Sequence, residues 1–215
     1  MHISEGVLSP EVLACGAALA ACGLAMGLRG LKDGRLMTAG LLSAAFFVGS
    51  LVHVPLGPGN VHLLLGGITG MLLGWAAFPA IFAALLLQAV LFQFGGLTVL
   101  GVNTFTMALP PVLCHYAFRS WLGSNTFRSR LGAFLCGFLS VAGSCVLTAA
   151  ALACTDEGFI PSAGILLAAH VPVMVIEGLI SAFLLIFLAK VRPELLDFAK
   201  PKAPLSAVSA PTDRA

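Results

Sequence analysis

Seven apolar stretches divide this chain, and their lengths restrict it to a small set of folds. Several are close to the 20 residues that an α-helix needs to cross a bilayer. Only 9% of the 215 residues are charged and 59% are hydrophobic, whereas roughly a quarter of an ordinary soluble domain is charged. The pattern predicts an all-α, polytopic membrane protein, a bundle of about seven transmembrane helices over residues 10–28, 36–54, 61–78, 79–94, 102–118, 131–154 and 164–189.

The basic residues fall in every second link between these stretches. When the links are assigned alternately to the two sides of a membrane, all 11 lysines and arginines lie on one side. Short basic loops stay in the cytoplasm. We therefore expect the N-terminus outside and the C-terminus in the cytoplasm, which an odd number of crossings requires.

The chain begins MHISEGVLSP, without a basic segment or a signal cleavage site. Met1 is therefore expected to be the mature N-terminus, with a free amine. Ser9 and Pro10 are typical of the N-cap and first position of a helix, which leaves residues 1–8 ahead of it. Eight residues reach at most about 25–29 Å, far enough for this segment to fold back onto the bundle.

Met1 and His2 form a candidate metal chelate. The terminal amine, the amide nitrogen of His2 and its imidazole can close fused five- and six-membered rings around one ion. Such donors suit metals with planar nitrogen coordination, chiefly Ni²⁺ and Cu²⁺, and also Co²⁺. The ordinary alternative for a histidine at position 2 is a solvated side chain.

A second histidine on the outer side would complete the plane of nitrogens. Asn60 is expected to cap the third span, which would place His62 in its first turn at the outer membrane face. His53, at the end of the second span, is the rival fourth ligand. Both assignments stay open on the residues alone.

Other polar residues lie within the apolar stretches. His170 and Glu177 are seven residues apart and so share a helix face. Their open roles are a proton relay, orientation of a ligand by the carboxylate, or hydrogen bonds between helices. Asn103 would line a cavity or cap a helix. The sequence contains no GxxxxGK[ST], HExxH or GxSxG motif, so we expect no ATP hydrolysis by this chain and no enzyme.

Four segments resemble the CbiM/NikM family, the substrate-binding (S) components of energy-coupling factor (ECF) transporters for cobalt and nickel. They are MHISEGVLSP (1–10), GPGNVHLLLGG (57–67), FGGLTVLGVNTFTMA (94–108) and HVPVMVIEGLISAFLLIFLAKVRPELL (170–196). The resemblance covers residues 1–196. The Pro/Ala/Ser-rich remainder, 197–215, is expected to be a disordered cytoplasmic tail.

The resemblance implies a transmembrane metal-binding domain over 1–196, with residues 1–9 as an inserted N-terminal metal-binding segment. It implies that Met1, His2 and His62 ligate Co²⁺ or Ni²⁺ as transported substrate, with no catalytic cofactor. The residues expected to support these ligands are His53, Asn60, Asn103, His170 and Glu177.

The predicted function is therefore the substrate-specific component of an ECF-type ABC importer in a bacterial or archaeal plasma (inner) membrane, taking up nickel or cobalt, with cobalamin biosynthesis as one use. Expected partners are a transmembrane T component, cytoplasmic ATPase subunits, a small accessory membrane protein and lipid, but no nucleic acid. Two alternatives stay open: a proton-coupled carrier for a small polar solute that uses His170 and Glu177, and a structural subunit of a larger membrane complex.

Overall fold

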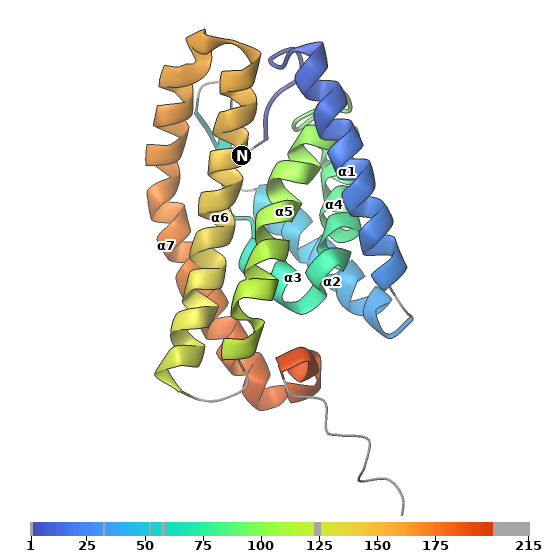
Figure 1. Ribbon diagram of the computed structural model, residues 1–215, viewed down its shortest axis with the longest axis vertical. Helices are drawn as coiled ribbons and strands as arrows, with labels where there is room; N and C mark the ends of the chain where they lie inside the picture. Colours follow the sequence, from blue (N-terminus) through green and yellow to red (C-terminus); the bar gives the residue numbers. More distant parts are fainter. Residues whose placement is uncertain (1, 32, 52, 57–58, 123–125, 200–215) are drawn as a thin grey trace, which may run out of the picture.

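The computed structural model describes residues 2–31, 33–51, 53–56, 59–122 and 126–199. Within them the chain forms helices and one small hairpin (Figure 1). The elements are α1 (Pro10–Gly30), α2 (Asp33–Leu51), β1 (His53–Leu56), β2 (Gly59–His62), α3 (Gly66–Leu73), η1 (Gly74–Ala76), α4 (Ala77–Phe92), α5 (Leu100–Phe118), η2 (Arg119–Trp121), α6 (Phe127–Thr155), η3 (Glu157–Phe159), α7 (Ile160–Val191) and η4 (Pro193–Ala199).

The helices have the length and composition of membrane spans. Four runs are long and apolar enough to cross a bilayer: Pro10–Gly30, Gly66–Phe92, Phe127–Thr155 and Glu157–Val191. A shorter apolar helix covers Arg35–Leu51. The length and composition of these helices confirm the prediction of a helical, multi-pass membrane protein.

The start of α1 follows the prediction. Ser9 is the N-cap, with extended backbone (φ −67°, ψ 152°), and its hydroxyl accepts a hydrogen bond from the Val12 amide at 3.5 Å. Pro10 occupies the first helical turn, where a missing N–H leaves no hydrogen bond unmade. The segment before Ser9 is thereby freed from the helix, and it turns back towards the middle of the bundle (Figure 1).

The stretch 61–78 is not the continuous helix that its apolar composition predicted. Residues 59–62 form β2, which pairs antiparallel with β1 so that His53 faces His62 and Val54 faces Val61. Strands separated by glycine and proline are typical of a hairpin, and valine favours extended backbone. Helix begins only at Gly66, after Leu65 in the left-handed region (φ 51°).

Two expectations about the third span were therefore wrong. Asn60 lies in β2 and does not cap a helix. His62 is the last residue of β2, four positions before α3, rather than part of a first helical turn. At eight residues, α3 is only about 12 Å long, too short to cross a bilayer unaided.

Small residues bring α3, α6 and α7 together at backbone distance. A Cβ on Gly67 of α3 would lie 2.5 Å from the Cα of Gly137 in α6. A Cβ on Gly137 would collide with the Glu177 carbonyl and lie 2.5 Å from the Ser181 hydroxyl of α7. This crossing fixes α3 against the longest pair of helices.

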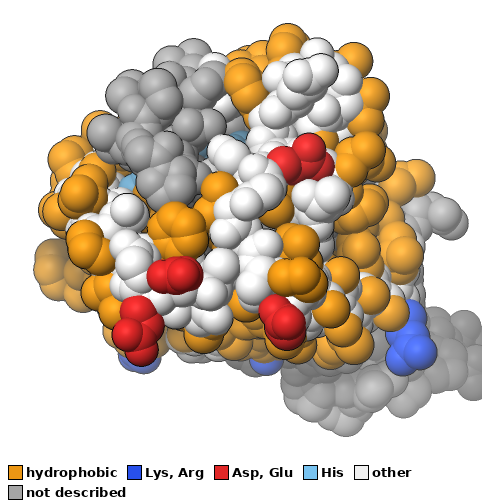
Figure 2. Space-filling model, turned by 90° about the horizontal axis from the view of Figure 1, so that it is seen from above, with side chains coloured by type: hydrophobic (Ala, Val, Ile, Leu, Met, Phe, Trp, Pro, Cys, Tyr) orange, Lys and Arg blue, Asp and Glu red, His pale blue; other side chains and the backbone are white. Residues whose placement is uncertain are grey.

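The two ends of the bundle differ in charge. Arg29, Arg35, Arg128 and Lys190 lie near the end of α1, the start of α2, the start of α6 and the end of α7. These helix ends all lie in the lower half of Figure 1. Seen from above in Figure 2, the opposite face shows acidic side chains, with basic ones only at its margin. Below the bundle, η4 continues to Ala199, and residues 200–215 of the expected tail lie outside the described residues.

The glycine crossing generates a stability prediction. Gly137→Ala should lower the free energy of unfolding by about 1–3 kcal/mol, because the added methyl group overpacks the contact with α7. The matched control is Gly164→Ala in α7, where a Cβ would meet nothing within 4 Å. Thermal unfolding in detergent measures both. An unchanged transition for Gly137→Ala would contradict the close crossing.

Candidate metal site

The first described residues are buried in the upper end of the bundle. His2 is 3% exposed and Ile3 is 1% exposed. Ile3 packs in an apolar cluster with Val99, Val102 and Leu152, from the start of α5 and the end of α6. Met1 itself lies outside the described residues. The polar start of the chain is thus an internal part of the fold.

Asn103, in the first turn of α5, holds the backbone of Ile3 in both directions. The Ile3 amide donates to Asn103 Oδ1 at 3.0 Å, and Asn103 Nδ2 donates to the Ile3 carbonyl at 3.1 Å. One carboxamide therefore satisfies two backbone groups, as a neighbouring strand would. Buried backbone groups need such partners, so Asn103 stabilises the inserted segment rather than simply lining a cavity or capping α5.

Glu5 makes a second attachment, at the surface. Its carboxylate accepts hydrogen bonds from the Thr98 amide at 3.0 Å and the Thr98 hydroxyl at 3.1 Å. These donors lower the pKa of Glu5, because they favour the ionised carboxylate. Glu5 is therefore charged at neutral pH.

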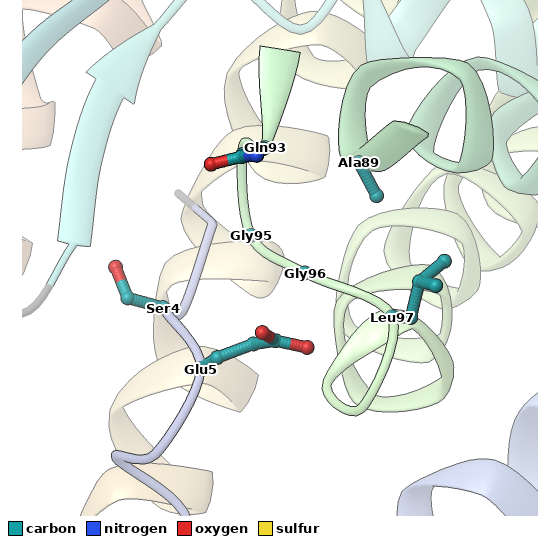
Figure 3. A pocket seen from close by; sticks show the side chains of 7 residues that line it. All are labelled: Ser4, Glu5, Ala89, Gln93, Gly95, Gly96 and Leu97. Atoms are coloured by element: carbon teal, nitrogen blue, oxygen red, sulfur yellow. The ribbon is translucent and has the colours of Figure 1, made fainter. Parts of the chain in front are cut away.

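The loop between α4 and α5 is shaped to receive this segment. Gly95 and Gly96 have φ values of +76° and +122°, and a Cβ on Gly96 would collide with the Glu5 side chain. Figure 3 shows Glu5 directed towards this loop across a pocket of about 450 Å³. The pocket is lined by Ser4, Glu5, Ala89, Gln93, Gly95, Gly96 and Leu97. The sequence alone did not assign a role to Glu5 or Thr98. The paired glycines of FGGLT were the one feature in the sequence that could have indicated a close approach of another segment to this loop.

His2 lies directly beside His62. Their ring centroids are 4.7 Å apart and the rings are inclined by 32°. His62 is 3% exposed, so protein encloses its ring as it encloses that of His2. Both histidines predicted as ligands are thus brought together, and the neutral imidazole is the form that binds metals.

The tautomer of His62 is set by the backbone. Its Nδ1 lies 3.0 Å from the Leu63 carbonyl oxygen, which can only accept, so Nδ1 carries the hydrogen. The lone pair is therefore on Nε2. That nitrogen is buried and has no hydrogen-bond partner among the described residues, which leaves it available to a ligand.

Glu177 holds the turn that follows His62. One of its oxygens accepts hydrogen bonds from the Leu64 amide and from the Leu65 amide, the latter at 2.6 Å. Leu65 is the left-handed residue at which the extended chain enters α3. Of the roles left open for Glu177, hydrogen bonding between elements is observed, and it anchors the backbone that carries His62.

The remaining predicted residues lie around this pair. His170 is fully buried in α7, and its Nδ1 lies 2.8 Å from the Leu166 carbonyl of the same helix. No hydrogen bond between His170 and Glu177 occurs in the described part of the chain. His53 faces His62 across the hairpin and Asn60 lies in β2, but their side chains are outside the described structure.

Comparison with known proteins places this chain in a family. A family model described as a cobalt uptake substrate-specific transmembrane region matches residues 2–195. A protein of Haemophilus influenzae named for metal transport is 43% identical over 200 residues, covering 92% of this chain and 97% of the relative. A fused nickel transport protein, NikMN, of Rhodobacter capsulatus is 32% identical over 240 residues. That alignment covers 98% of this chain and 66% of the relative.

The fold is also found among solved structures. The crystal structure of a transition metal transporter superposes with a TM-score of 0.75, at 24% identity, over 89% of this chain and 93% of the other. That likeness concerns the fold alone. The match of the family model over nearly the whole bundle is decisive for the assignment: the chain belongs to the CbiM family of cobalt uptake substrate-specific transmembrane regions.

Proposed function

We propose that this chain captures Co²⁺ or Ni²⁺ with its own N-terminus, as the substrate-specific component of an ECF-type importer. The observation that carries the proposal is the buried pair of His2 and His62, with ring centroids 4.7 Å apart. The names of the relatives, which refer to metal and nickel transport, agree with an ion as the transported substrate.

The donors of this site have to include the backbone. Among the residues that the structure describes, no group of three or more His, Cys, Asp or Glu side chains could hold a metal ion. Two imidazoles alone are a poor site for a divalent cation. The amine of Met1 and the amide nitrogen of His2 would supply the missing nitrogens, and a set of four nitrogens in a plane suits Ni²⁺.

The arrangement in the membrane follows from charge. The acidic face carries the metal site and would lie outside, whereas the basic end would face the cytoplasm. The chain then crosses seven times, the third crossing being made by β2, residues 63–65 and α3. Residues 1–196 form the metal-binding domain in a bacterial or archaeal plasma membrane, and the tail after it is cytoplasmic.

Uptake needs further chains in this proposal. A transmembrane T component and cytoplasmic ATPases would drive reorientation of the bundle, with a small accessory membrane protein beside them. The imported ion would serve cobalamin synthesis or a nickel enzyme. The alternative of a proton-coupled carrier gains no support, because Glu177 hydrogen-bonds Leu64 and Leu65 and is not joined to His170 by any described hydrogen bond.

A residue added before Met1 should abolish high-affinity binding. The extension converts the terminal amine into an amide and moves it out of the chelate ring. Isothermal titration with Ni²⁺, comparing the native start with the extended chain, should show a loss greater than the roughly 10–100-fold expected for an outer-shell change. Native affinity in the extended protein would contradict capture by the N-terminus.

The two outer histidines should differ in their effect. His62→Ala removes a buried nitrogen beside His2 and should weaken Ni²⁺ binding strongly. His53→Ala should weaken binding by no more than the roughly 10–100-fold that is typical of a residue outside the ligand set. The same titration measures both, and equal losses would indicate a different set of ligands.

Asn103→Leu should weaken binding more than Glu5→Ala. The first change removes two buried hydrogen bonds of about 1 kcal/mol each, which corresponds to about 30-fold in affinity. The hydrogen bonds of Glu5 are exposed and should matter less. A larger loss for Glu5→Ala would show that the surface attachment, not the buried one, holds the segment.

A further inference from the structure

An apolar groove opens on the side of the bundle at its basic end. It has a volume of about 590 Å³ and lies between the first turns of α2, the last turns of α7 and the short helix α3. Met37 and Leu41 of α2 form one wall, and Phe187 and Leu188 of α7 form the other. The groove is open to its surroundings, because Met37 is 82% exposed and Leu41 is 71% exposed.

The position of α3 produces this groove. Helices α2 and α7 both pack against α3, whereas contact between α2 and α7 themselves is slight among the described residues. Ile68 and Leu72, four residues apart on one face of α3, both line the groove. Helix α3 therefore holds the other two helices apart and forms the floor between them.

The apolar walls do not by themselves select what occupies the groove. In a bilayer the surrounding lipid chains are as apolar as leucine. A hydrocarbon chain therefore gains little free energy when it leaves the other lipid chains and enters the groove. Selection has to come from polar groups at the end of the groove.

The groove ends at a basic side chain. Arg192, directly after α7, is one of its lining residues. The Arg192 guanidinium lies 3.1 Å from a carboxylate oxygen of Glu194, and the two side chains are 68% and 54% exposed. Exposed ion pairs contribute little to stability, so a phosphate group can take the place of this carboxylate on Arg192.

Two further basic residues lie close to the same end. Arg35 precedes Thr38, which lines the groove, by three residues of α2, and Lys190 follows Phe187 by three residues in the last turn of α7. Residues three apart are neighbours on a helix surface. Arg35 and Lys190 are both exposed. The end of the groove is therefore bordered by positive charge from both walls.

We propose that this groove binds one anionic phospholipid, with an acyl chain between α2 and α7 and the phosphate at Arg192, near Arg35 and Lys190. A molecule that joins an apolar chain to an anionic headgroup matches an apolar groove with a basic end. Basic pockets between membrane helices on the cytoplasmic side recognise such headgroups. The bound lipid connects two helices that otherwise hardly touch, at the end of the bundle opposite His2 and His62.

The experiment uses the full chain in vesicles of equal parts phosphatidylglycerol and phosphatidylcholine with identical acyl chains. Native mass spectrometry of the released protein identifies the lipids that stay bound. The wild type should retain one phosphatidylglycerol in preference to phosphatidylcholine. Arg192→Gln should reduce this preference about fivefold, the effect of one basic side chain at a membrane surface. The matched control is Arg29→Gln, an exposed basic residue of α1 that does not line the groove, and it should keep the wild-type preference.

A second pair of variants tests the place of the acyl chain. Thr38→Phe adds bulk inside the groove and should abolish retention of the lipid. Leu36→Phe adds bulk on the same helix, at a residue that is 58% exposed and does not line the groove. This control should retain phosphatidylglycerol as the wild type does.

Several outcomes would overturn the proposal. Equal retention of the two lipids by the wild type would exclude recognition of the headgroup, and an equal loss in Arg29→Gln and Arg192→Gln would show a response to net charge alone. Retention of the lipid by Thr38→Phe would place it outside the groove. A wild type without bound phospholipid, from which only Thr38→Phe releases a co-purified membrane protein, would make the groove a protein docking site instead. None of these outcomes bears on metal capture by His2 and His62.

Discussion

The double hydrogen bond between Asn103 and Ile3 is the contact on which the site depends. A polar chain start has no intrinsic reason to lie inside an apolar bundle, because burying its backbone groups without partners is unfavourable. Asn103 satisfies one donor and one acceptor at once, and the side chain of Ile3 adds an apolar contact. Once Ile3 is fixed, the neighbouring His2 has little freedom, and its ring is held against His62.

The other half of the site is built by the interruption of a span. In a continuous helix over 61–78, the helix would have set the direction of the His62 side chain. The backbone amides after His62 would then have been used in hydrogen bonds within the helix. The observed hairpin and the left-handed Leu65 instead leave amides that Glu177 binds. Irregular backbone at membrane depth is tolerated where protein satisfies it. The candidate site thus lies between two non-helical segments inside a helical bundle.

Much of this was accessible from the sequence. The helices from 10, 102, 131 and 164 onward, the cap at Ser9 and the approach of His2 to His62 follow from hydropathy, capping chemistry and family resemblance. The hairpin could not be predicted in this way, because an apolar run of this length indicates a membrane span whether or not it is helical. The attachments of Glu5 and Asn103 depend on contacts between residues 93 and 100 positions apart in the chain, which no local pattern reveals.

The central claim is that the inserted N-terminal segment and His62 together form the metal site. X-ray absorption at the nickel edge, on the loaded full chain, tests it most directly because it reports the atoms around the ion. The account predicts a shell of nitrogen donors that includes at least two imidazoles, with the imidazole signal reduced in His62→Ala. A shell of oxygen or sulfur donors, or a spectrum that His62→Ala leaves unchanged, would contradict it.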